Sequence, residues 1–263
     1  MSLDWQQQTV IITGAYGGLG QHLCKNLSQR GAHLILTGRN IGKLQQLKQN
    51  LKKCTIVVGD VNATRFQTDL LATVIKHKSN SHMLINNAGI STAAFLSQQS
   101  NEEIKAQLDI NLLAPIMLSQ ALMSWLKSAK SGRIINIGST FGAIGYPGFS
   151  TYCASKFGLR GFSQALNREL SDTSVSVHYL APRAIATSIN SDQVNDLNKK
   201  LKNAVDKAED IVPQIIKSIE KNHSEKFFGF PEKLFAKINA LLPSVVSNAI
   251  NKDHKTIKQT LTK

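Results

Sequence analysis

The sequence reads Val10-Ile11-Ile12-Thr13-Gly14-Ala15-Tyr16-Gly17-Gly18-Leu19-Gly20 close to its start, and this stretch decides the fold. An apolar, β-branched run is followed by a glycine-rich turn, and the residues from Gln21 to Gln29 continue in a helical pattern. Gly14, Gly18 and Gly20 allow a tight turn and a close approach to a pyrophosphate, which the amides and positive dipole of the following helix attract. A turn without a ligand is the alternative. The order of strand, turn and helix near the N-terminus favours the pyrophosphate site.

The remainder of the chain alternates between short apolar runs and longer periodic segments. Strands buried on both faces of a parallel sheet form continuous β-branched runs, and the periodic segments between them indicate helices. The alternation predicts an α/β fold of the Rossmann type, a doubly wound, mostly seven-stranded parallel sheet with helices on both faces. The strands are predicted at Thr9–Thr13, His33–Thr37, Thr55–Val58, Met83–Asn86, Arg133–Ile137 and Ser174–Leu180, with a short seventh near Lys226–Phe228.

The length of 263 residues, without a linker-like tract or an internal repeat, predicts one domain over residues 1–263. Residues from about 188 to 263 are expected to form a C-terminal helical segment.

A proton-transfer site is predicted by Tyr152 and Lys156, four residues apart, together with Ser139 thirteen residues before the tyrosine. Residues four apart on a helix share a face, so the Lys156 ammonium can lie beside the Tyr152 phenol. A free phenol has a pKa of about 10, and a nearby cation is expected to lower that pKa. The Ser139 hydroxyl is expected to bind the substrate oxygen and to stabilise charge that develops there. A plain helix surface carrying a Tyr and a Lys is the alternative.

The sequence therefore resembles the short-chain dehydrogenases/reductases, and the resemblance extends from about Thr9 to Thr187. It implies an oxidoreductase with a Ser-Tyr-Lys-Asn catalytic set, here Ser139, Tyr152, Lys156 and Asn111. Besides the glycine turn and the Tyr-Lys pair with its Ser, the motifs that carry the resemblance are Asp60-Val61, Asn86-Asn87-Ala88-Gly89, Asn111, and Pro182 with Thr187.

The resemblance also implies roles for the matching residues. Asp60 and Val61 would border the adenine, and Asn87-Ala88-Gly89 would line the cofactor cleft. Asn111 would hold a water in a proton relay that reaches Tyr152 through Lys156, and Lys156 would also hydrogen-bond the nicotinamide ribose. The cofactor contacts expected in full are Gly14, Tyr16, Gly18, Leu19, Gly20, Arg39, Asp60, Val61, Asn87, Ala88, Gly89, Tyr152, Lys156, Pro182, Ile185 and Thr187.

The charge distribution predicts which nicotinamide cofactor is bound. No Asp or Glu occurs between Trp5 and Gly59, whereas Lys and Arg supply seven charges there, half of the net +14. An NAD site normally has a carboxylate at the end of the second strand, where it binds the ribose 2′-hydroxyl. Here Arg39 stands at that place, and a guanidinium can bind the 2′-phosphate of NADP(H). A solvated arginine at a strand end is the alternative, but the missing carboxylate favours NADP(H).

Composition restricts the other partners. The positive charge could attract nucleic acid, but the lysines are dispersed and no recognisable binding motif accompanies them, so no nucleic acid is expected. An acyl carrier protein, acyl-CoA or an anionic membrane surface fits the charge better. Three cysteines without disulfide or ligand spacing and seven scattered histidines predict a cytoplasmic protein without a metal site. By family resemblance, the long helices that hold Asn111 and follow Tyr152 are expected at a homodimer or homotetramer interface.

These features predict an NADP(H)-dependent oxidoreductase that reduces a carbonyl, expected to be a hydrophobic ketone or aldehyde, with Tyr152 as proton donor. A 3-oxoacyl reductase acting on chains bound to acyl carrier protein or CoA is one alternative. A cofactor-binding sensor or scaffold is another, although such proteins commonly lose the Tyr or the Lys.

Three features of the sequence depart from the family pattern. Gly17 stands where NADP-dependent relatives often have arginine or another polar residue, so one expected phosphate contact is missing. No family motif is matched after about Ser188, in the part that normally shapes the substrate pocket in the family. Arg183 stands where relatives usually have glycine, and it is expected to face the cofactor phosphates or the substrate. Apolar residues recur at helical spacing from Leu234 to Ile250, with Pro231 at a helix start and Pro243 at a break. This segment is expected to pack on the core or on a neighbouring subunit, to cover an apolar substrate cleft, or to contact a membrane surface.

Overall fold

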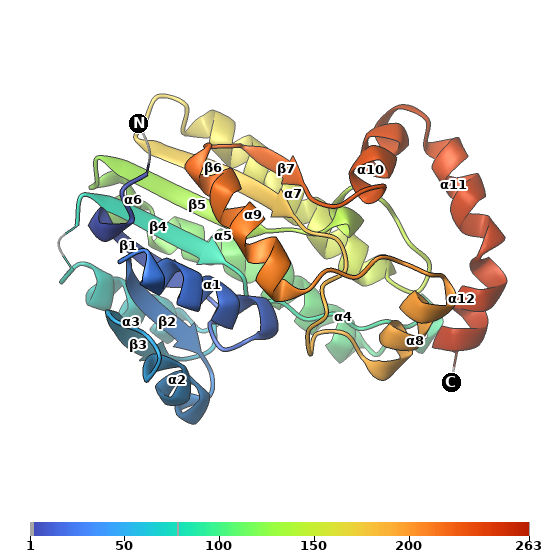
Figure 1. The fold of residues 1–263 in the computed structure, drawn as a ribbon, viewed down its shortest axis with the longest axis horizontal. Coiled ribbons are helices and arrows are strands. Elements are labelled where there is room, and N and C mark those ends of the chain that lie inside the picture. Colours follow the sequence, from blue (N-terminus) through green and yellow to red (C-terminus); the bar gives the residue numbers. More distant parts are fainter. Residues whose placement is uncertain (1–2, 78, 263) are drawn as a thin grey trace.

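The computed structural model describes residues 3–77 and 79–262. Its seven strands form one parallel sheet in the order β3-β2-β1-β4-β5-β6-β7 (Figure 1). The predicted Rossmann-type architecture is confirmed, and each strand begins and ends within two residues of its predicted bounds. The strands are β1 (Gln8–Ile12), β2 (His33–Gly38), β3 (Cys54–Val58), β4 (Ser81–Asn86), β5 (Ser131–Ile137), β6 (Val175–Ala181) and β7 (Glu225–Phe227).

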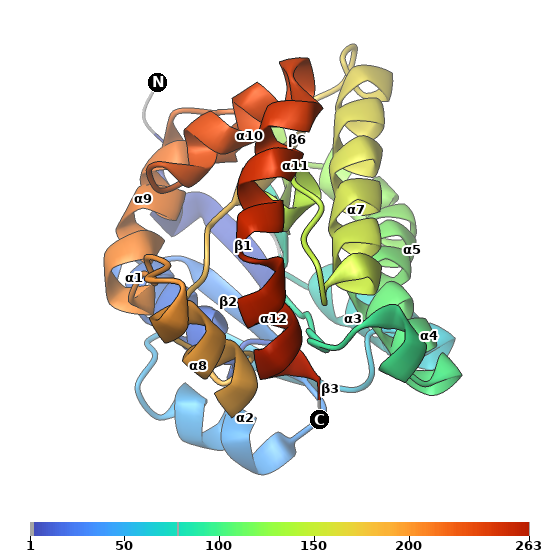
Figure 2. The ribbon, with the colours of Figure 1, turned by 90° about the vertical axis from the view of Figure 1, so that its right-hand side faces the viewer.

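Helices cover both faces of the sheet, and each face has its own hydrophobic core (Figures 1 and 2). Leucines of α1 and α2 and isoleucines of α9 pack on one face. Apolar residues of α3, α5, α6 and α7 pack on the other. These helices are α1 (Gly18–Gln29), α2 (Ile41–Lys48), α3 (Thr64–Val74), α5 (Ala114–Ala121), α6 (Met123–Lys127), α7 (Ser150–Glu169) and α9 (Ala208–Glu220). The strands inside the sheet are therefore buried on both sides, which explains their continuous apolar runs, while the edge strands β3 and β7 are partly exposed.

Further helices gather beyond the carboxyl ends of the strands (Figure 1). The predicted helix start and break are confirmed, since α10 (Glu232–Leu241) directly follows Pro231 and α11 (Pro243–Lys252) begins at the second proline. A third helix, α12 (His254–Leu261), was not predicted, and its Ile257 and Leu261 pack against Phe149. Together with α4 (Asn101–Leu108) and α8 (Asp192–Lys200), these helices surround the carboxyl ends of the strands.

Candidate active site

The main cavity of the protein lies at the carboxyl ends of the strands and has a volume of about 860 Å³. The glycine turn after β1 forms one end, the residues after β5 and the start of α7 form the middle, and α8, α10 and α11 form the far end. β1 lies between β2 and β4, so the cavity opens where the strand order reverses. Open α/β sheets bind their ligands at this position.

The glycine turn brings backbone close to the cavity. Gly14 has a φ of +63°, which L side chains rarely adopt, and a Cβ at Gly18 would lie 2.5 Å from the side chain of Thr187. All the residues expected at the cofactor line the cavity except Gly20. A Cβ at Gly20 would instead lie 2.3 Å from the Gly14 carbonyl oxygen, so this glycine lets α1 pack against the turn from behind.

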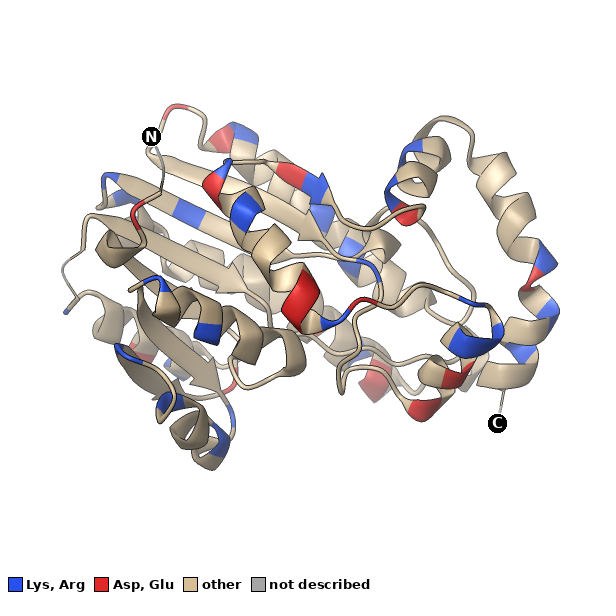
Figure 3. Ribbon diagram, in the orientation of Figure 1, with Lys and Arg blue, Asp and Glu red and all other residues tan. Residues whose placement is uncertain are grey.

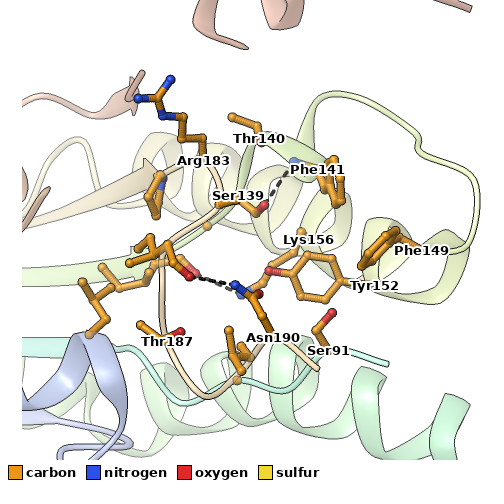
Figure 4. A pocket seen from close by; sticks show the side chains of 18 of the residues that line it. Ser91, Ser139, Thr140, Phe141, Phe149, Tyr152, Lys156, Arg183, Thr187 and Asn190 are labelled. Atoms are coloured by element: carbon orange, nitrogen blue, oxygen red, sulfur yellow. Dashed lines mark hydrogen bonds between the residues drawn. The ribbon is translucent and has the colours of Figure 1, made fainter. Parts of the chain in front are cut away.

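Three groups with complementary chemistry meet in the middle of the cavity. Ser139 follows β5, and Tyr152 and Lys156 lie on the first turns of α7 (Figure 4). The Lys156 Nζ lies 5.7 Å from the centre of the Tyr152 ring and donates a hydrogen bond of 3.1 Å to the carbonyl oxygen of Ile137. The Ser139 Oγ accepts a hydrogen bond of 3.1 Å from the backbone of Phe141, which fixes its position.

Burial shifts the pKa of both titratable groups of this trio. Burial raises the pKa of Tyr152 to about 12, and the Ser139 hydroxyl partly offsets the shift. Burial lowers the pKa of Lys156 to about 8. The Tyr152 pKa is therefore raised rather than lowered as expected, chiefly because the phenol is buried. Tyr152 is a protonated phenol at neutral pH, which is the form that can donate a proton.

Asn111 lies behind this trio rather than on the cavity wall. It is fully buried in a π-helical turn, η3 (Asp109–Leu113), between α4 and α5. Its Oδ1 accepts from the backbone of Ile90 (2.9 Å), and its Nδ2 donates to the Ile90 carbonyl (2.8 Å) and to Ser155 Oγ (3.2 Å). Single π-helical turns are often found at functional sites. Here the turn directs the amide toward Gly89, next to the Lys156 ammonium.

The far end of the glycine turn is positively charged. Arg39 directly follows β2 and lines the cavity, as does Tyr16. The Tyr16 ring packs closely on Gly38, because a Cβ at Gly38 would lie 2.4 Å from that ring. A second cation lies nearby, because the Lys43 Nζ is 5.7 Å from the centre of the Tyr16 ring. The sequence analysis did not place this lysine at the site. Figure 3 shows Lys and Arg but no Asp or Glu on α1 and α2.

Arg183 lines the cavity, but carboxylates neutralise its charge. Its guanidinium donates to Asp206 Oδ1 (2.7 Å), Glu232 Oε2 (3.2 Å) and the Phe230 carbonyl (3.0 Å). The expectation that this cation faces the cofactor phosphates or the substrate stays a prediction, because the residue lines the cavity but its charge is paired. The residue joins the loop after β6 to the start of α10, and its acidic partners lie 23 and 49 residues away in sequence.

Two residues that shape the site were missed by the sequence analysis. The Thr13 hydroxyl accepts hydrogen bonds of 2.9 Å from the backbone amides of both Asn87 and Ala88, which ties the glycine turn to the end of β4. Tyr179 of β6 lies fully buried beneath Ser139, and its hydroxyl bridges the backbone N–H and C=O of that serine at 3.2 and 3.1 Å. A Thr before a glycine turn could have been noticed. A buried tyrosine on a strand carries no comparable signal.

The substrate end of the cavity is predominantly apolar. Side chains on the inner side of α10 and α11 form part of the wall, opposite aromatic residues that follow β5. These wall residues are Phe141, Ile144, Tyr146, Phe149, Val194, Leu197, Phe235, Val246, Ala249 and Ile250. The C-terminal segment thus covers the cleft, as one of the three expectations for it proposed.

Across residues 3–77 and 79–262, no group of three or more His, Cys, Asp or Glu side chains could hold a metal ion. Over the same residues, no helix is long and apolar enough to cross a bilayer.

Comparison with known proteins identifies the family. Residues 8–198 match the family model described as short chain dehydrogenase. The chain is 35% identical over 199 residues to the 3-oxoacyl-(acyl-carrier-protein) reductase FabG of Rickettsia bellii, covering 75% of this chain and 80% of that protein. It is 27% identical over 209 residues to an uncharacterized oxidoreductase of Staphylococcus saprophyticus, covering 76% and 85%.

Solved structures share the fold along nearly the whole chain. A short-chain dehydrogenase from Streptomyces avermitilis superposes with a TM-score of 0.78 at 21% identity and covers 96% of this chain and 98% of its own. A short-chain dehydrogenase/reductase from Burkholderia phymatum superposes with a TM-score of 0.82 at 17% identity and covers 92% and 96%. With the family model matched over more than half of its length, this chain belongs to the short-chain dehydrogenases, a family of oxidoreductases.

Proposed function

We propose that the protein reduces the carbonyl group of a hydrophobic ketone or aldehyde with NADPH. The observation that carries the proposal is the continuity of one cavity, in which a glycine turn with Arg39, the Ser139-Tyr152-Lys156 trio and an apolar wall follow one another. A carbonyl held at the trio would have its apolar part against α10 and α11. Reduction is the proposed direction because NADPH usually serves as a reductant, and a protonated Tyr152 is the form that donates a proton in that direction.

The residues present fit a dinucleotide. Gly14 and Gly18 let the turn lie tightly against Ala88 and Thr187, where a Cβ would come within 3.0 and 2.5 Å. Gly14, Gly17 and Gly18 line the cavity, and backbone amides at the start of α1 suit a pyrophosphate. Arg39 and Lys43, beside Tyr16, would hold the 2′-phosphate of the adenosine ribose. Solved relatives include complexes with NADP and with NAD, so the proposed preference for NADP(H) rests on these two cations and on the missing carboxylate.

The chain's own residues carry the proton. The Ser139 hydroxyl would donate a hydrogen bond to the carbonyl oxygen and polarise it, while Tyr152 would give its phenol proton to that oxygen as the alcohol forms. NADPH, when bound, would supply the hydride that bonds to the carbonyl carbon. The Lys156 ammonium would stabilise the phenolate left on Tyr152 until the tyrosine regains a proton. The buried Asn111 amide holds backbone beside this lysine.

A second candidate substrate is a 3-oxoacyl chain on acyl carrier protein or CoA. The FabG relatives favour it, and the net charge of +14 would attract an acidic carrier. An apolar wall would accept the acyl chain of such a thioester as well as a free ketone. A panel of aliphatic and cyclic ketones, aldehydes and 3-oxoacyl thioesters, followed by the loss of nicotinamide absorbance, separates the two. If the protein turns over none of these substrates, the proposed reduction is contradicted.

We predict that Tyr152→Phe lowers the rate of reduction by a factor of about 10² to 10⁴, because the phenylalanine cannot donate a proton. The NADPH dissociation constant, measured by fluorescence titration, should change by less than about twofold, since ring packing is retained. Tyr146→Phe is the matched control, because Tyr146 lines the same cavity and should leave the maximal rate within a few-fold. Retention of more than a tenth of the activity in Tyr152→Phe would refute the assigned role.

A further inference from the structure

Helices α10 and α11 form a hairpin whose outer side is apolar and has no partner among the described residues (Figures 1 and 2). At the tip between the helices, Leu241 is 81% exposed and Leu242 58% exposed. Val245 on α11 and Leu234 on α10 are also about half exposed. Four large apolar side chains in water on one short hairpin indicate a surface that is covered by something when the protein is at work.

The same hairpin has an apolar inner side. Phe235 of α10 and Val246, Ala249 and Ile250 of α11 line the substrate end of the cavity. Neither Leu241 nor Leu242 lines the cavity. A helix that packs only against its own protein is apolar on one face. These helices are apolar on two faces, one toward the cavity and one toward solvent.

The charge on the hairpin is positive. From Pro231 to Lys252 its charged residues are Glu232, Lys233, Lys237 and Lys252. Glu232 is paired with Arg183 at 3.2 Å, so its carboxylate is neutralised. Figure 3 shows that most of α11 carries no charge. An apolar tip flanked by lysines is the composition of segments that lie in the interface of anionic membranes.

We propose that the α10–α11 hairpin docks on the surface of an anionic lipid bilayer, with Leu241, Leu242 and Val245 at the level of the headgroups. No helix of the described residues could cross the bilayer, so the contact is interfacial. Because the inner side of the same hairpin lines the cavity, docking would place the substrate end of the cavity next to the lipid phase. A hydrophobic substrate could then reach the cavity without crossing water.

A second copy of the chain is a weaker occupant for this surface. A two-fold symmetric contact through the hairpin would bring Lys233 and Lys237 of both copies onto one small interface. Like charges held together in this way repel each other, whereas phosphate headgroups attract them. An acyl carrier protein would complement the lysines, but its acidic surface would gain nothing from the exposed leucines.

Co-sedimentation with vesicles tests the proposal without cofactor or substrate, so its failure is distinguishable from failure of the proposed reduction. The wild-type protein should bind vesicles that contain a third of phosphatidylglycerol, release them at high salt, and bind pure phosphatidylcholine at least about tenfold more weakly. The double variant Leu241→Asp/Leu242→Asp should lose at least about tenfold in partitioning with an unchanged melting temperature. Ile75→Asp, at an equally exposed apolar site (62%) far from the hairpin, should bind as the wild type does.

Three results would overturn the proposal. The first is no binding to anionic vesicles. The second is equal vesicle binding by the leucine double variant, with loss only in Lys233→Glu/Lys237→Glu, which would show a purely electrostatic attraction. The third is that light scattering shows an oligomer for the wild type but a monomer for the leucine double variant, and that neither protein binds vesicles. This result would assign the surface to a second copy.

Discussion

Tyr179 holds the backbone of Ser139 from beneath. Its hydroxyl bridges the backbone N–H and C=O of Ser139, and it approaches the carbonyl of Lys156 at 3.4 Å. A Cβ at Gly138 would lie 2.2 Å from this tyrosine and one at Gly142 2.0 Å, so both glycines leave space for its ring. The Tyr179 side chain thus contacts the backbone of both Ser139 and Lys156, two of the three residues proposed to act on the carbonyl.

We predict that Tyr179→Phe lowers kcat about tenfold or more while KM and the NADPH dissociation constant change little, because it loosens Ser139 without altering the cavity wall. The variant leaves the Ser139 N–H without its partner, whereas the Ser139 carbonyl still accepts from the Gly142 N–H at 2.9 Å. We expect a cost of about 1 to 3 kcal/mol in the free energy of unfolding. Rates should therefore be measured well below its melting temperature. A fall in stability with an unchanged kcat would leave Tyr179 a purely structural residue.

Arg39 is the residue proposed to distinguish the two nicotinamide cofactors. Its replacement by alanine removes a charge-assisted contact worth roughly 1.5 to 3 kcal/mol, so NADPH affinity should fall about ten- to a hundredfold while NADH affinity changes little. Fluorescence titration with both cofactors measures this. Lys25→Ala, on the same acid-free stretch but outside the cavity lining, is the matched control. Equal weakening of NADPH and NADH in Arg39→Ala would contradict the assignment.

At the scale of elements, the Arg183 guanidinium fastens two segments that border the cavity. The loop after β6 carries Thr187 toward the glycine turn, and the backbone of Asp206 pairs with that of Ala184 and Ala186. Glu232 lies at the start of α10. Asp206, Glu232 and Arg183 have side chains exposed by 19, 25 and 17%. The cofactor side and the substrate side of the cavity are therefore held together by one side chain.

Replacing Arg183 by leucine should leave two partly buried carboxylates without their partner and lower the free energy of unfolding by about 1 to 3 kcal/mol. We also expect a several-fold rise in KM for the carbonyl substrate, because α10 loses its attachment to the loop. Arg160→Gln removes a comparable pair, with Glu225, that does not line the cavity. It should lower the melting temperature alone. A similar KM in both variants would show that the attachment does not position the wall.

The elements differ in how far the sequence determines them. The inner strands are predicted within two residues because they are buried on both faces and are therefore mostly apolar. The edge strand β7, Glu225–Phe227, is partly exposed and carries two charged residues. The meeting of the proposed catalytic trio is predictable because Tyr152 and Lys156 are one helical turn apart and Ser139 closely follows the end of β5. Arg183 finds its partners 23 and 49 residues further along, and no local pattern encodes such a contact. α12 has too few apolar residues to stand out, and its burial depends on Phe149 of another segment.

At the scale of the whole molecule, the proposed cofactor contacts and the apolar wall come from different parts of the sequence. The proposed cofactor contacts come from residues before 188, and much of the apolar wall comes from α8, α10 and α11. A chain ending at Phe230 would keep all seven strands. We predict that it binds NADPH but shows a KM for long-chain or polycyclic carbonyls raised far more than that for small ones.

The full-length double variant Phe235→Ser/Ile250→Ser controls for the truncation, because it alters only the wall and should show the same dependence on substrate size in milder form. Subunit mass is measured alongside. Equal loss for large and small substrates, together with a dissolved oligomer, would assign the C-terminal helices to assembly.

The strand order has a consequence for how the sheet can form during synthesis. In the order β3-β2-β1-β4-β5-β6-β7, β2 and β3 add in turn to one edge beside β1, and β4 to β7 add in turn to the other. Each strand that leaves the ribosome therefore meets a free edge, and none has to be inserted between two strands already paired. Domains fold from the N-terminus as they emerge. The strands from β1 to β6 can thus pair with one another before the α10–α11 hairpin has been translated.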